Sequence, residues 1–317
     1  MRRAAALAFL PLIAAAAIAG CGSSSSSSSA AAGADTNKSV TATGSFGKEP
    51  KVTIPAEKGT GPLYTKTVIQ GTGATLTTSE SLVGNFALYD WSGKTHKLIG
   101  SSYSDGVPTL FAGQLLPGLE KALIGQKMGS RVLAVMPPKD AYGSSGNSQF
   151  GIGPSDTVVF VIDMIKEVSN AANATGKQVS DGGGALPTVT AGSPAKGPAI
   201  TIPKTAAPKT LQVKTLIKGT GPAVKKGQLL IAQYTGENYR TKSIFDSSYS
   251  RSVPAGFVIG AGQVIPGWDK GLVGQTVGSR VLLVIPPADG YGSNGNSQAG
   301  IKPTDTLVFV VDIIGVD

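Results

Sequence analysis

The 317-residue sequence predicts two tandem α+β domains, each an antiparallel sheet packed against one short helix. Residues 113–165 align without gaps on residues 262–314 and are identical at 34 of 53 positions, which indicates a duplicated domain. Each copy contains short β-rich runs separated by turn residues, a pattern typical of an antiparallel sheet. Each copy also contains one helical signal of about two turns, which is too short to persist alone and must therefore lie against the sheet.

The expected strands follow in the same order in both copies. Each copy is expected to begin with an entry strand, in the related sequences PKVTIP at Pro50 and PAITIP at Pro198. The main strands are expected at 64–69, 82–88, 131–136 and 157–165 in the first copy, and at 211–217, 229–234, 280–285 and 306–314 in the second. The last two runs of each copy are continuously apolar, so we expect them to be buried strands.

The helix of each copy lies between a proline and a glycine. Pro117 and Pro266 occupy the first helical turn, and Gly125 and Gly274 mark the ends. The two apolar strands that follow are separated by a long loop, AYGSSGNSQFGIGPSD in the first copy and GYGSNGNSQAGIKPTD in the second. Loops of this length are uncommon in compact domains and are usually functional.

We divide the chain into five segments. Residues 1–20 are expected to be a leader, 21–49 a disordered tether, 50–166 the first domain, 167–197 a flexible linker and 198–317 the second domain. The tether contains an unbroken serine run and then small and polar residues without an apolar period, so it cannot bury enough surface to offset its chain entropy. The linker is rich in Gly, Ala, Ser, Thr and Pro.

The N-terminus has the pattern of an export signal. Arg2 and Arg3 precede an apolar stretch, and Ile-Ala-Gly-Cys21 follows. The stretch falls short of the roughly 20 apolar residues of a transmembrane helix. The pattern resembles a bacterial lipoprotein leader with its lipobox; an ordinary secretory leader with an incidental cysteine is the alternative. The resemblance implies lipidation of Cys21, which would hold the protein, outside the cytoplasm, at the bacterial cell membrane.

Composition excludes several classes of function. The formal net charge is +9, but Lys and Arg are scattered singly, so nucleic acid is not an expected partner. His96 is the only histidine and Cys21 the only cysteine, which excludes His/Cys metal sites and triads that depend on those residues. We expect neither a metal nor a cofactor. His96 itself is expected on an exposed hairpin of the first domain.

The informative residues are aromatic, because aromatic residues make up only 6% of the chain. In the second copy they fall on different strands, on the helix and on the long loop, which is how an apolar pocket is usually lined. For any single one of them, an ordinary place in the core is an equal alternative. The set consists of Tyr234, Phe245, Phe257, Trp268, Tyr291 and Phe309.

The motifs around these aromatics are QYTG from Gln233, IFDSS from Ile244, GQVIPGW from Gly262, YG at Tyr291 and TLVF from Thr306. In order and spacing they resemble the FKBP-type peptidyl-prolyl cis/trans isomerases across residues 205–317. The resemblance implies an antiparallel sheet wrapped around one short helix, with a pocket for the proline of a polypeptide client. The implied catalytic residues are Tyr234, Phe245, Asp246, Ile265, Trp268, Tyr291 and Phe309, and the implied substrate-binding residues are Arg251, Phe257, Val264 and Ile301.

The resemblance also assigns roles and shows two departures. It places Trp268 at the floor of the pocket and Arg251 beside Asp246. Ala255 stands where the family often has an aromatic residue, and the loop from Ser293 to Gly300 lacks the family's usual pattern. These departures concern the rim of the pocket and its sequence preference.

The first copy keeps the frame but not the pocket. At the positions of Tyr234, Phe245, Asp246 and Trp268 it has Phe86, Ile99, Gly100 and Leu119, and it lacks three residues after Phe111. We therefore expect the first domain to be a weak or inactive isomerase that binds peptides or acts as a spacer. For the whole chain the leading hypothesis is an isomerase for exported polypeptides. A non-catalytic chaperone and a surface spacer are the alternatives.

Overall fold

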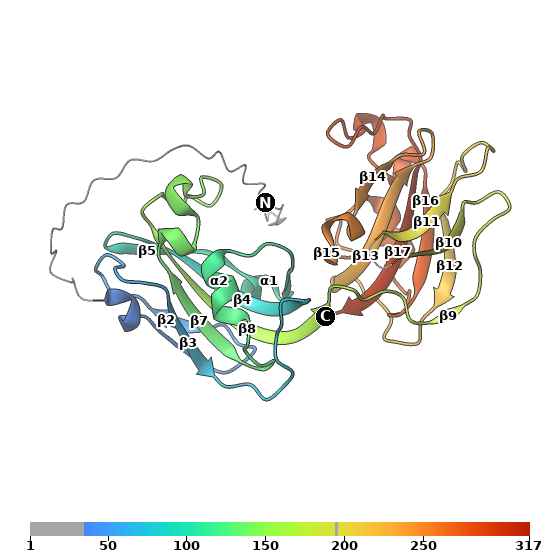
Figure 1. The fold of residues 1–317 in the computed structure, drawn as a ribbon. Helices are drawn as coiled ribbons and strands as arrows, with labels where there is room; N and C mark the ends of the chain where they lie inside the picture. Colours follow the sequence, from blue (N-terminus) through green and yellow to red (C-terminus); the bar gives the residue numbers. More distant parts are fainter. Residues whose placement is uncertain (1–34, 194–195) are drawn as a thin grey trace, which may run out of the picture.

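The computed structural model describes residues 35–193 and 196–317, which form two domains of the same topology (Figure 1). Cys21 and the expected leader lie outside the described residues. The sheet of the first domain has the strand order β3-β7-β8-β4-β5, with β6 paired to β4, and all its pairs are antiparallel. Its elements are β3 (Tyr64–Ile69), β4 (Glu80–Ser92), β5 (Thr95–Ser101), α1 (Ser102–Asp105), β6 (Thr109–Phe111), α2 (Pro117–Leu123), β7 (Arg131–Met136) and β8 (Thr157–Ser169).

The second domain repeats this arrangement. Its sheet has the order β14-β13-β17-β16-β12-β9, with β15 paired to β13. Its elements are β12 (Gln212–Lys218), β13 (Leu229–Asn238), β14 (Ile244–Ser247), β15 (Ala255–Val258), α3 (Pro266–Leu272), β16 (Arg280–Ile285) and β17 (Leu307–Val316). Both α2 and α3 begin at the predicted proline, and the antiparallel sheets with few short helices agree with the predicted fold class.

The long loop of each domain is built from two short 3-10 helices and a tight turn. In the first domain these helices are η2 (Pro138–Asp140) and η3 (Gly143–Ser145), and in the second they are η5 (Pro287–Asp289) and η6 (Gly292–Asn294). Asn296 and Ile301 then exchange two backbone hydrogen bonds of 2.8 Å, which close the loop back onto the domain. The loop is therefore ordered by its own backbone.

The central strands are buried on both faces. Along β7, Val132 packs in the core beneath α2, whereas its neighbour Leu133 packs on the opposite, outer face of the sheet. In the second domain Leu283 and Leu282 divide in the same way. Successive strand residues point to opposite faces, so two-sided burial requires an unbroken apolar run. This is why these strands read as continuously apolar in the sequence.

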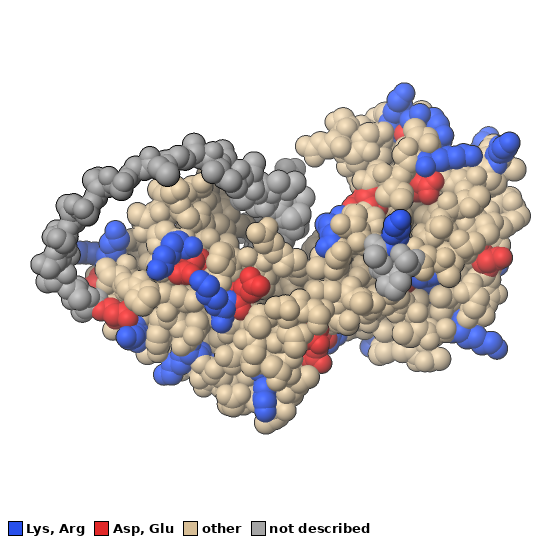
Figure 2. Space-filling model, in the orientation of Figure 1, with Lys and Arg blue, Asp and Glu red and all other residues tan. Residues whose placement is uncertain are grey.

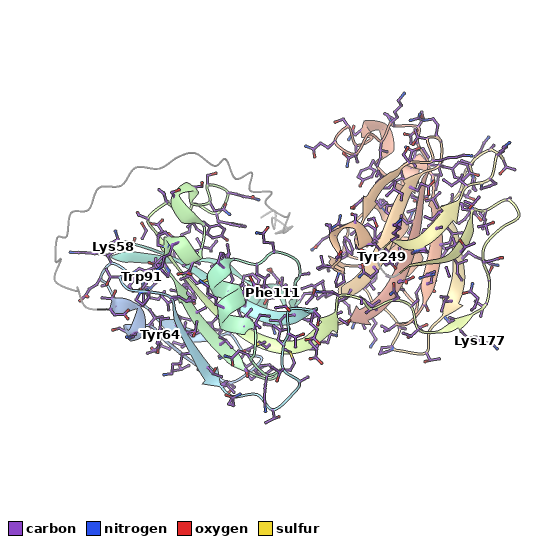
Figure 3. All side chains as sticks on the ribbon, in the orientation of Figure 1. Lys58, Tyr64, Trp91, Phe111, Lys177 and Tyr249 are labelled. Carbon is purple, nitrogen blue, oxygen red and sulfur yellow. The ribbon has the colours of Figure 1, made fainter. Side chains whose placement is uncertain are left out.

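A small hairpin covers the outer face in each domain. In the first domain it consists of β1 (Thr41–Thr43) and β2 (Lys51–Thr53), preceded by η1 (Thr36–Ser39), and it packs Val40 and Ala42 against Trp91. In the second domain it consists of β10 (Thr188–Ser193) and β11 (Gly197–Thr201), which bring Val189 and Ile200 onto the sheet. Figure 3 shows Trp91 on the first domain, near Lys58.

The positions of these hairpins show that the predicted limits of the tether and of the linker were wrong. The tether was expected to extend to residue 49, but residues 35–49 fold onto the first domain, where the buried guanidinium of Arg131 binds the carbonyls of Gly44, Ser45 and Lys48. The linker was expected to be flexible over 167–197. Instead β8 continues to Ser169, β9 (Lys177–Gln178) joins the edge of the second sheet, and β10 follows. Sequences poor in apolar residues are ordered here by backbone hydrogen bonds and a few buried contacts.

The two domains contact each other directly. Val83 of β4 packs with Leu229 and Ile231 of β13 in one apolar cluster. At its edge the Lys166 ammonium lies 2.7 Å from the carboxylate of Asp317, close to the marked C-terminus in Figure 1. Val83 and Ile231 occupy equivalent places in the two copies, so each domain uses the same outer patch of its sheet. The contact therefore has approximate twofold character.

His96 is an exposed residue of β5, on the hairpin that β4 and β5 form, as predicted. Over the described ranges, none of the helices has the length and apolar character needed to cross a membrane.

Candidate active site

Trp268 forms the floor of an aromatic cluster in the second domain. Pro266 is the first residue of α3, a position where a backbone N–H would have no partner within the helix, so proline is favoured there. The helix directs Trp268 toward the sheet, with only 3% of the residue exposed. Three rings stand edge-on around the indole, with centroids 5.4 Å away for Tyr234, 4.8 Å for Phe257 and 5.2 Å for Phe309. They come from β13, β15 and β17, so packing of the sheet and helix fixes their geometry.

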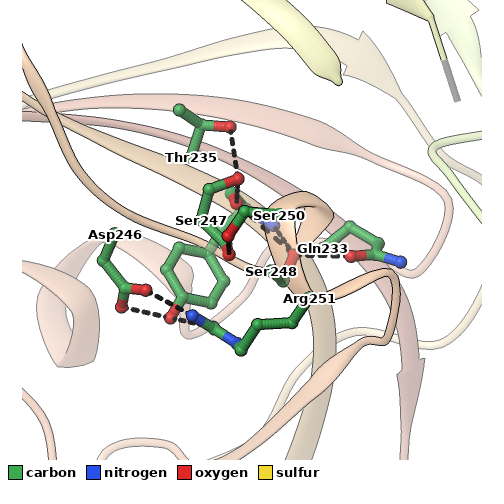
Figure 4. Close-up of polar contacts among 8 residues, drawn as sticks. Gln233, Thr235, Asp246, Ser247, Ser248, Ser250 and Arg251 are labelled. Atoms are coloured by element: carbon green, nitrogen blue, oxygen red, sulfur yellow. Dashed lines mark hydrogen bonds and ion pairs between the residues drawn. The ribbon is translucent and has the colours of Figure 1, made fainter. Parts of the chain in front are cut away.

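A polar triangle forms one wall of the cluster (Figure 4). The Tyr234 hydroxyl donates a hydrogen bond of 2.5 Å to Asp246 Oδ2. Arg251 donates from Nη1 to Asp246 Oδ1 at 2.6 Å and from Nη2 to the Tyr234 oxygen at 2.9 Å. The side chains of Arg251 and Asp246 are 37% and 41% exposed, so their ion pair contributes little to stability. Its effect is to fix the direction of the Tyr234 ring.

The electrostatics keep this wall in one protonation state. Burial, and then the adjoining Asp246 carboxylate, raise the pKa of Tyr234 well above its ordinary value. Burial alone would lower the pKa of Arg251, but its contacts with Asp246 and Tyr234 together raise it. The Tyr234 hydroxyl is therefore protonated and the guanidinium charged at neutral pH. The wall acts by shape and hydrogen bonding rather than by proton transfer.

Most of the remaining predicted residues pack around the aromatic cluster. The Phe245 ring of β14 stands edge-on to Phe309 at 5.4 Å. Val264 and Ile265, just before α3, and the buried Ile301 of the long loop pack on the same aromatic core. Tyr291, between η5 and η6, is 37% exposed, and within the described ranges no ring contact or hydrogen bond joins it to the cluster. The structure thus brings the other predicted residues of this domain together around one apolar core.

Two donors at this site have no partner among the described residues. No hydrogen bond of these residues uses the backbone N–H of Ile265, directly before α3. The indole N–H of Trp268 is buried and also lacks an acceptor within the described ranges. Burying a donor without an acceptor costs free energy. The cluster can therefore hold an apolar ring that carries a carbonyl acceptor near Ile265.

Sequence reasoning missed two polar residues behind the wall. The Ser248 hydroxyl accepts the backbone N–H of Tyr234 at 2.8 Å and donates to Gln233 Oε1 at 2.5 Å (Figure 4). Gln233 is 2% exposed and Ser248 is fully buried. Both residues stand in the QYTG and IFDSS motifs, directly beside Tyr234 and close to Asp246. Their position in these motifs, beside predicted site residues, could have indicated that they support the wall.

The equivalent place in the first domain is wholly apolar. Phe86 stands edge-on to Phe111 at 5.9 Å and lies 6.0 Å from Phe160. Gly100 offers no carboxylate, and Leu119 takes the place of the floor indole. Asp105 stands where the second domain has Arg251, a difference that the sequence comparison had not used. The first domain therefore keeps three rings but has neither the polar wall nor the indole floor.

A separate concavity lies elsewhere on the second domain. It is a cleft of about 450 Å³ beside Tyr239, whose side chain packs on the outer face of the sheet. Lys204, Arg240 and Lys242 line it, and Asp305 holds Arg240 through a contact of 2.7 Å. Figure 2 shows several basic side chains at this end of the molecule, whereas acidic and basic side chains are interspersed over the visible face of the first domain. This cleft is distinct from the aromatic cluster.

Comparison with known proteins places the cluster in a family. A family model described as FKBP-type peptidyl-prolyl cis-trans isomerase matches residues 78–165 and 221–314, so both aromatic clusters lie within matched segments. An FK506-binding protein of Streptomyces anulatus is 40% identical over 119 residues, which cover 38% of this chain and 96% of that protein.

Two further comparisons cover more of the chain. Peptidyl-prolyl cis-trans isomerase FKBP9 of Bos taurus is 29% identical over 236 residues, which cover 73% of this chain but only 34% of that protein. The solved structure of the three FKBP domains of wheat FKBP73 covers 80% of this chain and 94% of its own, with 19% identity and a TM-score of 0.32.

Proposed function

Because the chain belongs to the FKBP-type peptidyl-prolyl cis-trans isomerase family, we propose that its second domain isomerises X–Pro bonds in exported or cell-surface polypeptides. The observation that carries this proposal is the combination, found in the second domain only, of an indole floor and a polar wall. Trp268 supplies the floor and Tyr234 with Asp246 the wall. In the first domain these places hold Leu119, Phe86 and Gly100.

The reaction needs no nucleophile. Rotation about the X–Pro bond is slow because twisting the amide costs its resonance, a barrier of roughly 18–20 kcal/mol. The twisted amide is less charge-separated than the planar amide, so transfer from water into an apolar pocket costs the transition state less than the ground state. Only such differential stabilisation accelerates the step. An aromatic pocket with few polar groups fits this requirement.

The residues then take distinct roles. The prolyl ring packs on the Trp268 indole between Tyr234 and Phe309, and the Ile265 N–H donates to the carbonyl after the proline. The accessible Tyr291 hydroxyl orients the carbonyl before it. Asp246 does not touch the reacting bond; it holds the Tyr234 ring through its 2.5 Å hydrogen bond. Each tenfold gain in rate needs only about 1.4 kcal/mol, which a few such contacts supply.

The decisive test compares matched variants in the full chain. Trp268→Leu gives the second domain the residue that the first domain already has, and we expect it to lower kcat/KM for a prolyl peptide by at least about tenfold. Tyr291→Phe should lower it by a smaller factor. Tyr142→Phe makes the same change at the equivalent place of the first domain and should leave the rate unchanged. Exchange NMR on an X–Pro peptide measures all three rates. Equal losses from Tyr291→Phe and Tyr142→Phe would contradict the assignment of activity to the second domain.

For the first domain we propose peptide holding without isomerisation. Leu115, Leu116 and Phe150 pack only partly buried on its apolar core, which leaves surface for a peptide. The alternative is that the whole protein is a non-catalytic chaperone. In that case the full-length chain would suppress aggregation of an unfolded client, and Trp268→Leu would not change the isomerisation rate. A refolding assay limited by proline isomerisation separates the two functions.

The location of the protein is a further part of the proposal. Cys21, preceded by small residues and an apolar stretch, supports a lipid anchor on the outer side of the cell membrane. Mass spectrometry of the mature N-terminus should find an acylated cysteine at residue 21. Cys21→Ala should release the protein from the membrane fraction, and an unmodified N-terminus elsewhere in the chain would contradict the anchor.

A further inference from the structure

Asn170 connects the two domains through polar contacts. Its backbone N–H donates to the carbonyl of Ser79 at 3.0 Å, and its side-chain Oδ1 accepts from the Ser81 hydroxyl at 2.6 Å; both partners belong to the first domain. Its own carbonyl accepts from Gln233 Nε2 of the second domain at 2.9 Å. Asn170 is thus fixed to one domain by two hydrogen bonds and offers a third to the other.

Gln233 carries this contact into the site. Its Nε2 binds the Asn170 carbonyl and its Oε1 accepts from the Ser248 hydroxyl, so the side-chain amide has a partner at each end. Ser248 has one hydroxyl proton, which it gives to Gln233, and its oxygen accepts the backbone N–H of Tyr234. The Ser248 backbone N–H donates in turn to the Tyr234 carbonyl at 3.0 Å. Both backbone groups of Tyr234 are therefore hydrogen-bonded to Ser248, and the carbonyl also accepts from the Ser247 hydroxyl at 3.3 Å.

Apolar packing at the domain contact supports the chain of hydrogen bonds. Leu110 of β6 lies directly over Gly256 of β15, where an added Cβ would come within 3.0 Å of the Leu110 Cβ. β15 also carries Phe257, which touches the Trp268 indole. The first domain thus contacts β13 and β15, two of the strands that supply aromatic rings to the pocket.

At the equivalent position of the first domain, no hydrogen bond of the described residues joins the Asn85 side chain to the second domain. Ser102 accepts the Phe86 N–H at 2.9 Å and lies 3.1 Å from Asn85 Oδ1, which repeats the serine and amide pair. Asparagine is one methylene shorter than glutamine. Asn85 lines an open cleft of about 320 Å³ between the domains, which Asp317 also lines. The polar connection therefore runs from the first domain to the pocket of the second, and not in the opposite direction.

We propose that Asn170 and Gln233 are positioning residues through which the first domain holds Tyr234 and the pocket wall of the second domain in place. This inference rests on the proposed isomerase function of that pocket. It gives the first domain a role that needs no pocket of its own. Asn170 lies between the two segments that match the family model, so the connection belongs to the arrangement of this chain and not to a single domain.

The test uses two substitutions at one position in the full chain. Asn170→Ala removes the acceptor for Ser81, whereas Asn170→Asp keeps a side-chain oxygen there. We expect Asn170→Ala to lower kcat/KM about three- to tenfold, the size of one lost hydrogen bond, mainly through a higher KM. Asn170→Asp should restore most of the loss. Gln233→Ala should lower kcat/KM at least as much as Asn170→Ala.

A second readout does not depend on activity. The chain has only two tryptophans, so incorporation of 5-fluorotryptophan gives two ¹⁹F NMR resonances. The Trp268 resonance should shift or broaden in Asn170→Ala and return to the wild-type position in Asn170→Asp, while the Trp91 resonance stays unchanged in both. An inactive wild-type chain would refute the proposed function and leave this spectral test intact. Unchanged kinetics together with an unchanged Trp268 resonance in Asn170→Ala and Gln233→Ala would overturn the inference.

Discussion

The Tyr234 hydroxyl and the Asp246 carboxylate meet at 2.5 Å in the second domain, and the same two places in the first domain hold Phe86 and Gly100. The frame behind them is unchanged. In each domain an arginine pairs with an aspartate at 2.6 Å across the last two strands, Arg131 with Asp163 and Arg280 with Asp312. The duplicated domains therefore differ in the polar groups of the aromatic cluster and are alike where side chains hold the sheet together.

The first prediction concerns the wall of the pocket. Tyr234→Phe removes the hydroxyl but keeps the ring that packs on Trp268. We expect kcat/KM for a prolyl peptide to fall about tenfold because the ring loses the hydrogen bond that fixes its direction. The free energy of unfolding should change by no more than about 1 kcal/mol, since Asp246 and Arg251 remain paired and partly solvated. A rate equal to wild type would show that the polar wall is not needed.

The second prediction concerns the buried ion pair of the first domain. Arg131 and Asp163 are both fully buried, and Asp163→Asn leaves the guanidinium charge uncompensated. We expect a loss of about 3–5 kcal/mol in the free energy of unfolding of that domain. Lys270→Met breaks the exposed pair between Lys270 and Asp289 and should cost less than about 1 kcal/mol. Urea unfolding followed by hydrogen exchange of each domain measures both, and equal effects would contradict the argument from burial.

The third prediction concerns pH. Burial, and then the facing Asp156 carboxylate, raise the pKa of Asp90 to about 6, while Lys97 opposes the shift. An unfolded chain releases this proton near pH 4, at a pKa of about 3.9. Between these values the folded protein binds a proton that the unfolded chain has lost, so the free energy of unfolding falls as pH rises from about 4 to 6 and then levels off.

The second domain supplies the matched substitution for this test. Asn238 stands at the place of Asp90 and donates from Nδ2 to Asp305 at 2.7 Å. Asp90→Asn should therefore stabilise the first domain at pH 7 by about 1 kcal/mol or more, through a new hydrogen bond to Asp156. It should also remove the fall in stability between pH 4 and 6. A pH profile for Asp90→Asn that keeps this fall would assign it to another group.

The fourth prediction concerns the N-terminal hairpin. Val40 is buried against the outer face of the first sheet, so Val40→Asp places a charge in an apolar cluster. We expect the first domain to lose at least about 3 kcal/mol of stability. Its neighbour Thr41, the first residue of β1, is exposed, and Thr41→Asp should be close to neutral. Equal and small effects would mean that residues 35–49 are not part of the folded domain.

The limits of a strand were predictable where proline or glycine in the sequence marks its end. The expected limits of 64–69, 131–136 and 280–285 coincide with β3, β7 and β16. Proline or glycine lies close to the end of each of these strands, and both residues interrupt backbone pairing. The short helices were also predictable because Pro117 and Pro266 fix the first turn. In contrast, β8 extends beyond the predicted end at residue 165, because its polar last residues pair with β4 without an apolar pattern.

Only half of each hairpin was predicted. The second strands, β2 and β11, coincide with the predicted entry strands, whereas the first strands, β1 and β10, fall in the expected tether and linker and escaped prediction for a related reason. Only a few of their residues, such as Val40, Ala42 and Val189, are buried, and so few apolar positions give no measurable period. The continuous apolar run of β7 already implied that something covers the outer face of the sheet. Which segment covers it depends on contacts between residues far apart in the chain, and these contacts leave no local pattern.

The sequence by itself determined that this protein is a duplicated α+β chain with one complete and one reduced aromatic pocket, because those conclusions depend on residue identity at repeated spacings. Only the tertiary structure decided how the two halves are joined. The Gln233 side chain donates to the backbone carbonyl of Asn170, 63 positions away, and a backbone acceptor leaves no mark in the sequence. A contact at that separation is made by the packing of two complete domains, so it exists only once both have folded.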